Sequence, residues 1–191
     1  MPKFVITGAS GAGKSTLIAA LMAEGYAIVP EAGRQIVSEQ VGSRGTALPW
    51  LDRGAFMELL FERSIMAFDR ASGGANEAVF FDRSFIEAIA YATVIGQPAP
   101  PAMLGAAATR TFDSPVFVCP PWKEIFTTDE ERRHDFAFAA RDYQANVEAY
   151  LAAGYDLVEA PRLPVGERVA FITRQLAHLP SFRPSNPAEK L

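Results

Sequence analysis

A glycine-rich segment followed by a lysine and a serine occupies residues 8–15. It matches the pattern G-x-x-x-x-G-K-[ST], in which backbone N–H groups cradle phosphates and the lysine reaches the β- and γ-phosphates. The serine hydroxyl binds Mg²⁺ in such loops, and the following helix presents the positive end of its dipole to the anion. We therefore predict a nucleoside-triphosphate site made of Gly8, Ala9, Ser10, Gly11, Ala12, Gly13, Lys14, Ser15 and Thr16.

The segment lies in the context that a phosphate-binding loop requires. The run Phe4-Val5-Ile6 predicts a buried strand just before it. Apolar residues at helical spacing over 15–23 predict a helix just after it. A chance glycine-rich turn is the alternative, and the strand–loop–helix order favours nucleotide binding over it.

Acidic residues follow two further predicted strands. Glu31 comes after the strand predicted over 26–29, and Asp82 follows the strand predicted over 78–81. Because ligands of open α/β sheets gather at the carboxyl ends of the strands, both acids should flank the loop. Phosphoryl transfer needs an acid that orients the acceptor hydroxyl and an acid that anchors Mg²⁺. We assign Glu31 to the first role and Asp82, with Ser15, to the second, although which acid is the base stays open. A helix cap at Asp82 and a helix-dipole partner at Glu31 are the alternatives.

Five arginines are candidates for acceptor binding or charge stabilisation. Arg34 follows Glu31 by three residues in the sequence, and Arg83 follows Asp82 directly. Each of these arginines either binds the acceptor or is solvated. Arg63 interrupts an apolar helical stripe and either points into the acceptor pocket or extends to solvent. Arg132 and Arg133 follow the fourth predicted strand and a proline-rich loop, which favours a lid that brings a guanidinium onto the γ-phosphate. Surface ion pairing is the alternative for these two.

The order of predicted elements indicates an α/β fold. Strands are predicted at 4–6, 26–29, 78–81, 115–118 and 155–158. Helices are predicted at 15–23, 31–41, 52–71, 84–95, from 101, at 129–153 and at 165–179, with a loop over 42–51. The helix from Asp129 carries an apolar stripe that includes Tyr150 and Leu151. Short apolar strands alternating with helices predict a mostly parallel sheet covered on both faces.

Length and composition exclude several classes. The chain has 191 residues, a formal net charge of −4 and 49% hydrophobic residues, which indicates one globular domain rather than a disordered or fibrous chain. The single cysteine, Cys119, cannot form an intramolecular disulfide, which fits a reducing compartment. The acidic balance argues against a nucleic-acid binder, and no apolar run is long enough for a membrane span. We expect a cytoplasmic protein with no nucleic-acid or membrane partner.

The remaining motifs separate the classes of phosphate-loop protein. No aspartate begins a D-x-x-G motif and no Asn-Lys pair occurs, so the guanine-recognition pattern of GTPase switches is missing. A multidomain motor would need a longer chain for its helical lid domain. A small ATP-dependent phosphotransferase is therefore our leading hypothesis. The alternative is a regulatory NTP-binding module that hydrolyses slowly and has no small-molecule acceptor.

The motifs together resemble the P-loop kinases of the nucleoside, thymidylate and nicotinamide-riboside kinase group. The shared parts are the glycine-rich loop, Val29–Arg34, Phe81–Ser84, and Pro120-Pro121-Trp122 leading to Arg132-Arg133. They are most similar to uncharacterised proteins with an AAA-type ATPase domain. The resemblance implies a five-stranded parallel sheet in order 2-3-1-4-5 and a lid after strand four.

The resemblance also implies ATP and Mg²⁺ as cofactors and a nucleoside, nucleotide or riboside as acceptor, without fixing which. We place a single kinase-like domain at 1–180, with its lid at about 120–135, and a proline-rich tail at 181–191. A homodimer is left open.

Overall fold

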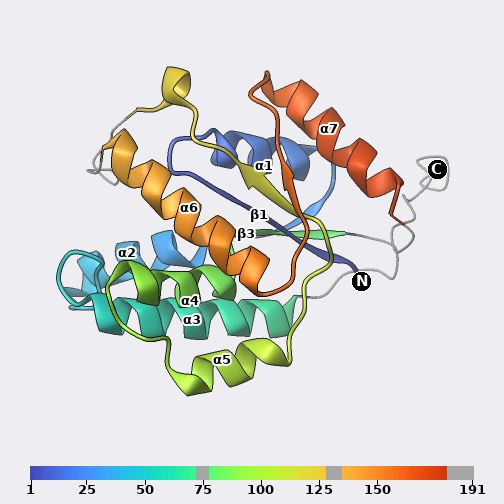
Figure 1. Ribbon diagram of the computed structural model, residues 1–191. Coiled ribbons are helices and arrows are strands. Elements are labelled where there is room, and N and C mark those ends of the chain that lie inside the picture. Colours follow the sequence, from blue (N-terminus) through green and yellow to red (C-terminus); the bar gives the residue numbers. More distant parts are fainter. Residues whose placement is uncertain (72–77, 128–134, 180–191) are drawn as a thin grey trace.

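Five parallel strands form one sheet in the order β2-β3-β1-β4-β5 (Figure 1). The computed structural model describes residues 1–71, 78–127 and 135–179. The strands are β1 (Lys3–Gly8), β2 (Ala27–Val29), β3 (Val79–Asp82), β4 (Val116–Cys119) and β5 (Leu157–Glu159). Strand order and direction are those predicted. The predicted tail at 181–191 and both lid arginines, Arg132 and Arg133, lie outside the described residues.

Helices connect the strands. They are α1 (Lys14–Ala23), α2 (Ala32–Ser43), α3 (Arg53–Arg70), α4 (Phe85–Val94), α5 (Pro101–Ala108), α6 (Phe136–Ala152) and α7 (Val165–Ala177), with a short 3₁₀ turn, η1 (Lys123–Ile125), after β4. In the described part of the chain, no helix has the length and apolar character needed to cross a membrane.

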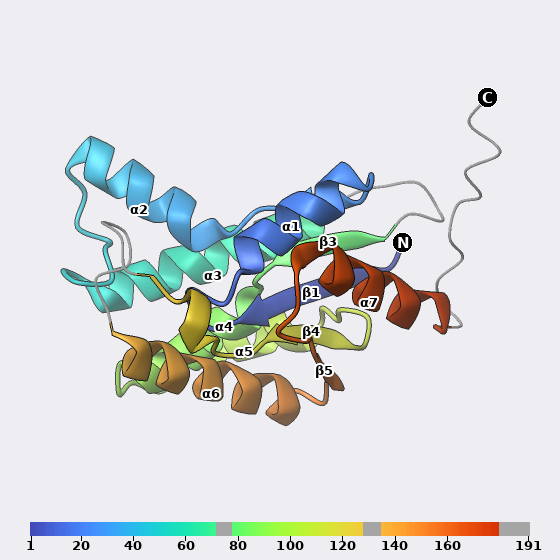
Figure 2. The same ribbon diagram turned by 90° about the horizontal axis from the view of Figure 1, so that it is seen from above.

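The strands carry apolar side chains to both faces of the sheet, because successive residues point to opposite sides. Phe4 and Ile6 of β1 belong to a core cluster with α1 and α7, whereas Val5 belongs to a second cluster with α3, α4 and α6. Figure 1 shows α1 and α7 above the sheet and α3, α4 and α5 below it, and Figure 2 shows the same layers from above. The prediction of a parallel sheet covered on both faces is therefore confirmed.

The register of the strands brings their carboxyl ends to one edge of the sheet. Ile6 pairs with Asp82, and Gly8 pairs with Cys119. Val29, the last residue of β2, pairs with Phe81. The segments that leave β1, β2, β3 and β4 consequently start next to one another, and all the predicted strand-end residues meet there.

Three helix details differ from the predictions. Helix α6 begins at Phe136 rather than Asp129, because Asp135 caps it and its carboxylate accepts from the Phe138 N–H at 2.7 Å. Helix α2 runs on to Ser43 and ends at Arg44, whose φ of 58° is left-handed. Leu151, predicted as part of the buried stripe of α6, is 55% exposed. Apolar spacing finds a helix but does not show where neighbouring layers cover it.

Truncating a core side chain of α4 and truncating an exposed side chain of α6 should lower the free energy of unfolding by different amounts. Phe85 is fully buried and packs against the Phe61, Phe68 and Phe112 rings, so Phe85→Ala should lower the free energy of unfolding by about 3–5 kcal/mol. Leu151→Ala should cost less than about 0.5 kcal/mol. Urea unfolding of both variants measures the difference. A comparable loss in the two would show that Leu151 is covered in solution.

Candidate active site

The glycine-rich loop folds back onto the end of β4. The Ala9 N–H donates to the Cys119 carbonyl oxygen at 3.0 Å. Gly8 has a φ of 139°, and a Cβ at this position would lie 2.2 Å from that same oxygen. Gly11 and Gly13 also have positive φ values, of 77° and 72°. Glycine is therefore required where the loop leaves β1, because only a chain without a Cβ can approach β4 so closely.

Lys14 begins α1, and its ammonium group lies between two carboxylates. Its Nζ contacts Asp82 Oδ1 and lies 3.7 Å from Glu31 Oε2. The lysine is buried, with only 7% of its side chain exposed, so it needs such partners. The ends of β1, β2 and β3 are joined electrostatically through this one side chain.

Arg83 links the charge cluster to Glu87 of α4 and to the start of the glycine-rich loop. Its Nε lies 3.2 Å from Glu31 Oε1, its Nη1 pairs with Glu87, and its Nη2 donates to the Gly8 carbonyl oxygen at 3.2 Å. Its φ of 69° is strained for a residue with a side chain, and such strain is typical of functional turns. The next residue, Ser84, caps α4 by accepting from the Ile86 N–H at 3.1 Å. This turn places the side chains of Asp82 and Arg83 in contact with Lys14 and Gly8 of the glycine-rich loop.

The buried acids of the cluster respond differently to their surroundings. Burial works to raise the pKa of Glu31, but Arg83, Lys14 and Arg34 together hold it below its ordinary range. Burial dominates at Glu87 and raises its pKa, although Arg83 opposes the shift. Glu31 is accordingly a stable carboxylate at neutral pH, which suits a group that accepts a hydrogen bond from a hydroxyl.

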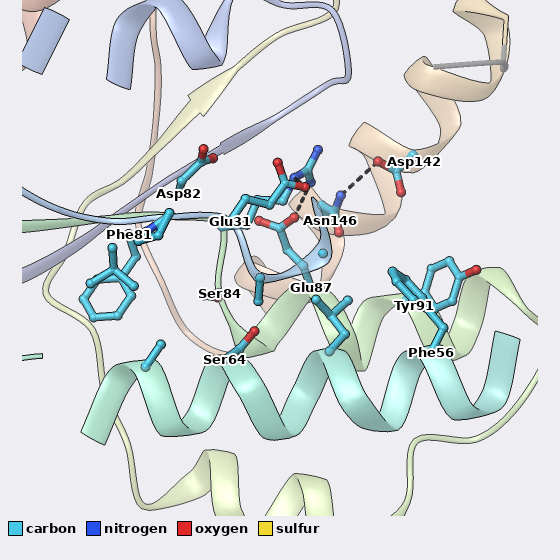
Figure 3. Close-up of a pocket in the computed structure, with 17 residues that line it drawn as sticks. Glu31, Phe56, Ser64, Phe81, Asp82, Ser84, Glu87, Tyr91, Asp142 and Asn146 are labelled. Atoms are coloured by element: carbon cyan, nitrogen blue, oxygen red, sulfur yellow. Dashed lines mark hydrogen bonds and ion pairs between the residues drawn. The ribbon is translucent and has the colours of Figure 1, made fainter. Parts of the chain in front are cut away.

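A cavity of about 150 Å³ opens beside the cluster (Figure 3). Glu31, Asp82 and Arg83 form one side of it, and Asp142 and Asn146 of α6 form another. The remaining lining residues come from the ends of β2 and β3, from α3 and from the starts of α2 and α4: Val29, Pro30, Ala32, Gly33, Phe56, Leu60, Ser64, Ala67, Phe81, Ser84, Glu87 and Tyr91. The cavity has a charged end at Asp82 and Arg83 and an aromatic end at Phe56 and Tyr91.

The comparisons with known proteins agree with this geometry. A family model described as an AAA domain matches residues 3–168, which is most of the chain. The chain belongs to this AAA-domain family. A comparison with curated protein sequences gave no match for this AAA domain.

Solved structures of two kinases and of a NadR protein share the fold of this AAA domain. A deoxyadenosine kinase from M. mycoides with bound dATP has a TM-score of 0.62 at 17% identity, over 93% of this chain and 100% of that one. A NadR protein in complex with NR has a TM-score of 0.70 at 17% identity, and it covers 97% of this chain, which spans 54% of NadR. A thymidylate kinase from Ehrlichia chaffeensis has a TM-score of 0.57 at 15% identity, over 92% of this chain and 100% of that one. The predicted P-loop kinase fold is thereby confirmed.

The two predicted metal residues, Ser15 and Asp82, both neighbour Lys14, Ser15 in the chain and Asp82 through its contact with the ammonium group. Ser15 and Thr16 follow Lys14 in the exposed first turn of α1. Among the described residues, no group of three His, Cys, Asp or Glu side chains could hold a metal ion. Mg²⁺ needs no such cage, because it is commonly bound through one or two carboxylates, waters and phosphates. The hydroxyl and carboxylate oxygens of Ser15 and Asp82 are the hard donors that suit it.

The predicted arginines separate into two groups. Arg83 lines the cavity, and Arg34 stands at its edge, where its Nε lies 3.3 Å from Glu31 Oε2. Arg63 instead pairs with Glu39 of α2, at 2.7 Å, and is not among the residues that line the cavity. Of the two placements open to Arg63, the structure therefore shows the one that extends to solvent, because α2 offers a carboxylate there.

Several cavity residues were not found from the sequence, and four of them carry polar groups near the charge cluster or the aromatic end: Glu87, Tyr91, Asp142 and Asn146. Glu87 follows Ser84 at the spacing of a capping box, a pattern that predicts a structural role. Its side chain instead pairs with Arg83 and accepts from the Tyr150 hydroxyl at 3.2 Å. Buried Asn146, a polar residue on the apolar face of α6, was the one available signal.

Arg168 of α7 was also missed, and it lies beneath the glycine-rich loop. Its Nη1 donates to the Gly13 carbonyl oxygen at 3.2 Å, and its Nη2 lies 3.0 Å from the Cys119 sulfur. Its guanidinium stacks over the Trp122 ring, 5.9 Å from the ring centroid. The arginine is 3% exposed, so α7 supports the loop from inside the core.

Two glycine substitutions test how the loop is held. Gly8→Ala should lower the free energy of unfolding by on the order of 4 kcal/mol, because its Cβ meets the backbone of β4. Gly25→Ala is the matched control, since Gly25 has a φ of 90° with open space around it, and it should cost only about 1–2 kcal/mol. Urea unfolding compares them. Equal losses would contradict the close approach to Cys119.

Proposed function

We propose that this AAA domain is an ATP- and Mg²⁺-dependent phosphotransferase that acts on a hydroxyl of a small acceptor, such as a nucleoside, nucleotide or riboside. One observation carries the proposal. The Nζ of Lys14, at the end of the glycine-rich loop, lies 3.7 Å from Oε2 of Glu31, which lines the cavity. A cation for the transferred phosphoryl group and a carboxylate for the acceptor hydroxyl therefore share one position, as phosphoryl transfer requires.

The nucleotide side uses the loop and the start of α1. The N–H groups of Gly8–Thr16 would bind the phosphates, aided by the dipole of α1, and Lys14 would neutralise charge on the transferred group. Ser15 and Asp82 would hold Mg²⁺, which when bound withdraws charge from the phosphoryl oxygens. The structural neighbours are kinases, which supports a nucleotide with Mg²⁺ at this position.

The acceptor side uses Glu31. The acceptor oxygen forms a bond to the γ-phosphorus, the bond from that phosphorus to the bridging oxygen breaks, and ADP leaves. The hydroxyl proton passes to Glu31, whose charged form is stabilised by Arg83, Lys14 and Arg34. A carboxylate with a lowered pKa is a weak base, which is sufficient because the transition state of phosphoryl transfer is loose and needs mainly positioning. Arg34 and Arg83 would hold Glu31 and the acceptor in place.

The direct test measures ADP release with Mg-ATP and a panel of nucleosides, ribosides and nucleotides. We expect release that depends on one class of acceptor and phosphate recovered on that acceptor. Release of free phosphate at the same rate with every acceptor, and with none, would instead identify a regulatory NTP-hydrolysing module.

Removal of the loop lysine should abolish transfer without unfolding the chain. Lys14→Met should lower kcat by at least about a hundredfold, on the scale of losing a preorganised donor to the transferred group. Arg70→Met is the charge-matched control, because Arg70 is exposed at the far end of α3, and it should retain full activity. Steady-state kinetics and thermal unfolding are measured for both. Wild-type turnover in Lys14→Met would refute a catalytic phosphate-binding loop.

If Arg132 or Arg133 belongs to a lid, replacing it should lower kcat much more than it lowers the affinity for ATP. Arg132→Ala or Arg133→Ala should lower kcat roughly ten- to a thousandfold if that residue stabilises the γ-phosphoryl charge. ATP affinity without acceptor should change much less, because an open lid makes few ground-state contacts. Calorimetry and kinetics separate the two effects. Wild-type kcat in both single variants and the double variant would show that the pair is only a solvated surface.

A further inference from the structure

Acids outnumber bases among the charged side chains that line the cavity. Glu31, Asp82, Glu87 and Asp142 line it, and among the described lining residues Arg83 is the one arginine or lysine. Figure 3 shows Asp142 and Asn146 on the α6 side of the opening, with Glu31 and Glu87 on the other. An acceptor that enters the cavity therefore meets more negative than positive charge.

The cations at the cavity are already neutralised by these acids. Lys14 lies between Asp82 and Glu31, and Arg83 lies between Glu31 and Glu87. The Nε of Arg83 lies 3.2 Å from Glu31 Oε1, and its Nη1 pairs with buried Glu87. Arg83 is thus held as a charged group by the protein itself, and its charge is not available to bind an acceptor phosphate.

Asp142 adds a negative charge that forms no direct ion pair with a described cation. Its Oδ2 accepts from the Asn146 amide at 3.4 Å, and no lysine, arginine or histidine within the described ranges forms an ion pair with it. It is half-buried on α6 and lines the cavity. A second anion placed beside it would face repulsion that solvent screens only partly.

We propose that this cavity takes an unphosphorylated acceptor, a neutral or cationic alcohol, and rejects phosphomonoesters. The inference rests on the proposed phosphotransferase function and narrows its acceptor. Carboxylates accept hydrogen bonds from hydroxyl groups, whereas a phosphate dianion within about 4–6 Å of them is disfavoured. The product is then a phosphomonoester, so the enzyme catalyses a first phosphorylation and not the extension of an existing phosphate.

The aromatic end of the cavity indicates that the acceptor also carries a ring. Phe56 and Tyr91 contact each other edge-to-face there, with ring centroids 5.7 Å apart. The cavity volume of about 150 Å³ equals that of a protein cavity which takes one benzene molecule. This volume suits a single six-membered ring at Phe56 and Tyr91 rather than a fused bicyclic base, so the acceptor we infer is a riboside with a one-ring base whose sugar hydroxyls face the acids.

Matched pairs of acceptors test the proposal. Uridine, cytidine and nicotinamide riboside are each compared with their own 5′-monophosphate in the ADP-release assay, with phosphate recovered on the acceptor. We expect kcat/KM for at least one riboside to exceed that of its monophosphate by at least about tenfold. Equal or better use of the monophosphates would overturn this inference and leave the phosphotransferase function standing. Hydrolysis independent of every acceptor would overturn both.

An isosteric variant tests the charge itself. Asp142→Asn should reduce the preference for riboside over monophosphate roughly tenfold, because it removes one negative charge from the wall. Glu148→Gln is the matched control, since Glu148 is exposed on the same helix and outside the cavity, and it should leave the preference unchanged. The preference is a ratio within one protein, so partial unfolding does not alter it. An unchanged ratio in Asp142→Asn would overturn the role of this charge.

The wild-type protein provides a readout that does not depend on a variant folding. Salt screens charge repulsion more than it affects the binding of a neutral riboside. The preference for uridine over its monophosphate should therefore fall as the salt concentration rises from about 0.05 to 0.5 M, with KM for the monophosphate decreasing. A preference that is constant or rises with salt would overturn exclusion by charge.

Discussion

Burying an ammonium group costs free energy unless carboxylates neutralise it, and the position of Lys14 imposes this requirement on the whole site. The lysine opens α1, so its partners must come from the neighbouring strands. Asp82 is supplied by the end of β3 and Glu31 by the end of β2. Glu31 in turn requires Arg83, and buried Glu87 completes the arrangement. Acids and bases alternate through the cluster, and every member is fixed by its neighbours.

The same neutralisation shapes what the cavity can bind. A site that recognises phosphate usually contains arginine or lysine side chains that are not already paired with acids of the protein. Here Lys14 is shared between two acids on the nucleotide side, and Arg83 is enclosed by acids on the acceptor side. In the function we propose, phosphate recognition by the described residues would therefore be concentrated in the backbone amides of the glycine-rich loop, and the cavity wall would bind hydroxyl groups and rings.

Backbone geometry matters as much as charge for keeping the site in place. The loop is pinned on one side by the approach of Gly8 to β4 and supported on the other by Arg168 of α7. The left-handed conformation of Arg83 is tolerated because Ser84 caps α4 directly after it and the Arg83 N–H donates to the Ile6 carbonyl oxygen at 3.1 Å. Strain in that turn is offset by hydrogen bonds on both sides.

The sequence alone determined the strands, the phosphate-binding loop and the strand-end acids Glu31 and Asp82, because these follow from local patterns and from the rule that parallel strands end at one edge. Tertiary structure decided the rest. Glu87 and Asp142 become cavity residues only when α4 and α6 pack beside the sheet, and Arg63 is drawn away from it by Glu39. The spacing of residues along the chain shows which face of a helix a residue occupies, but it does not show which charged side chain packs against that face. That depends on contacts between segments far apart in sequence.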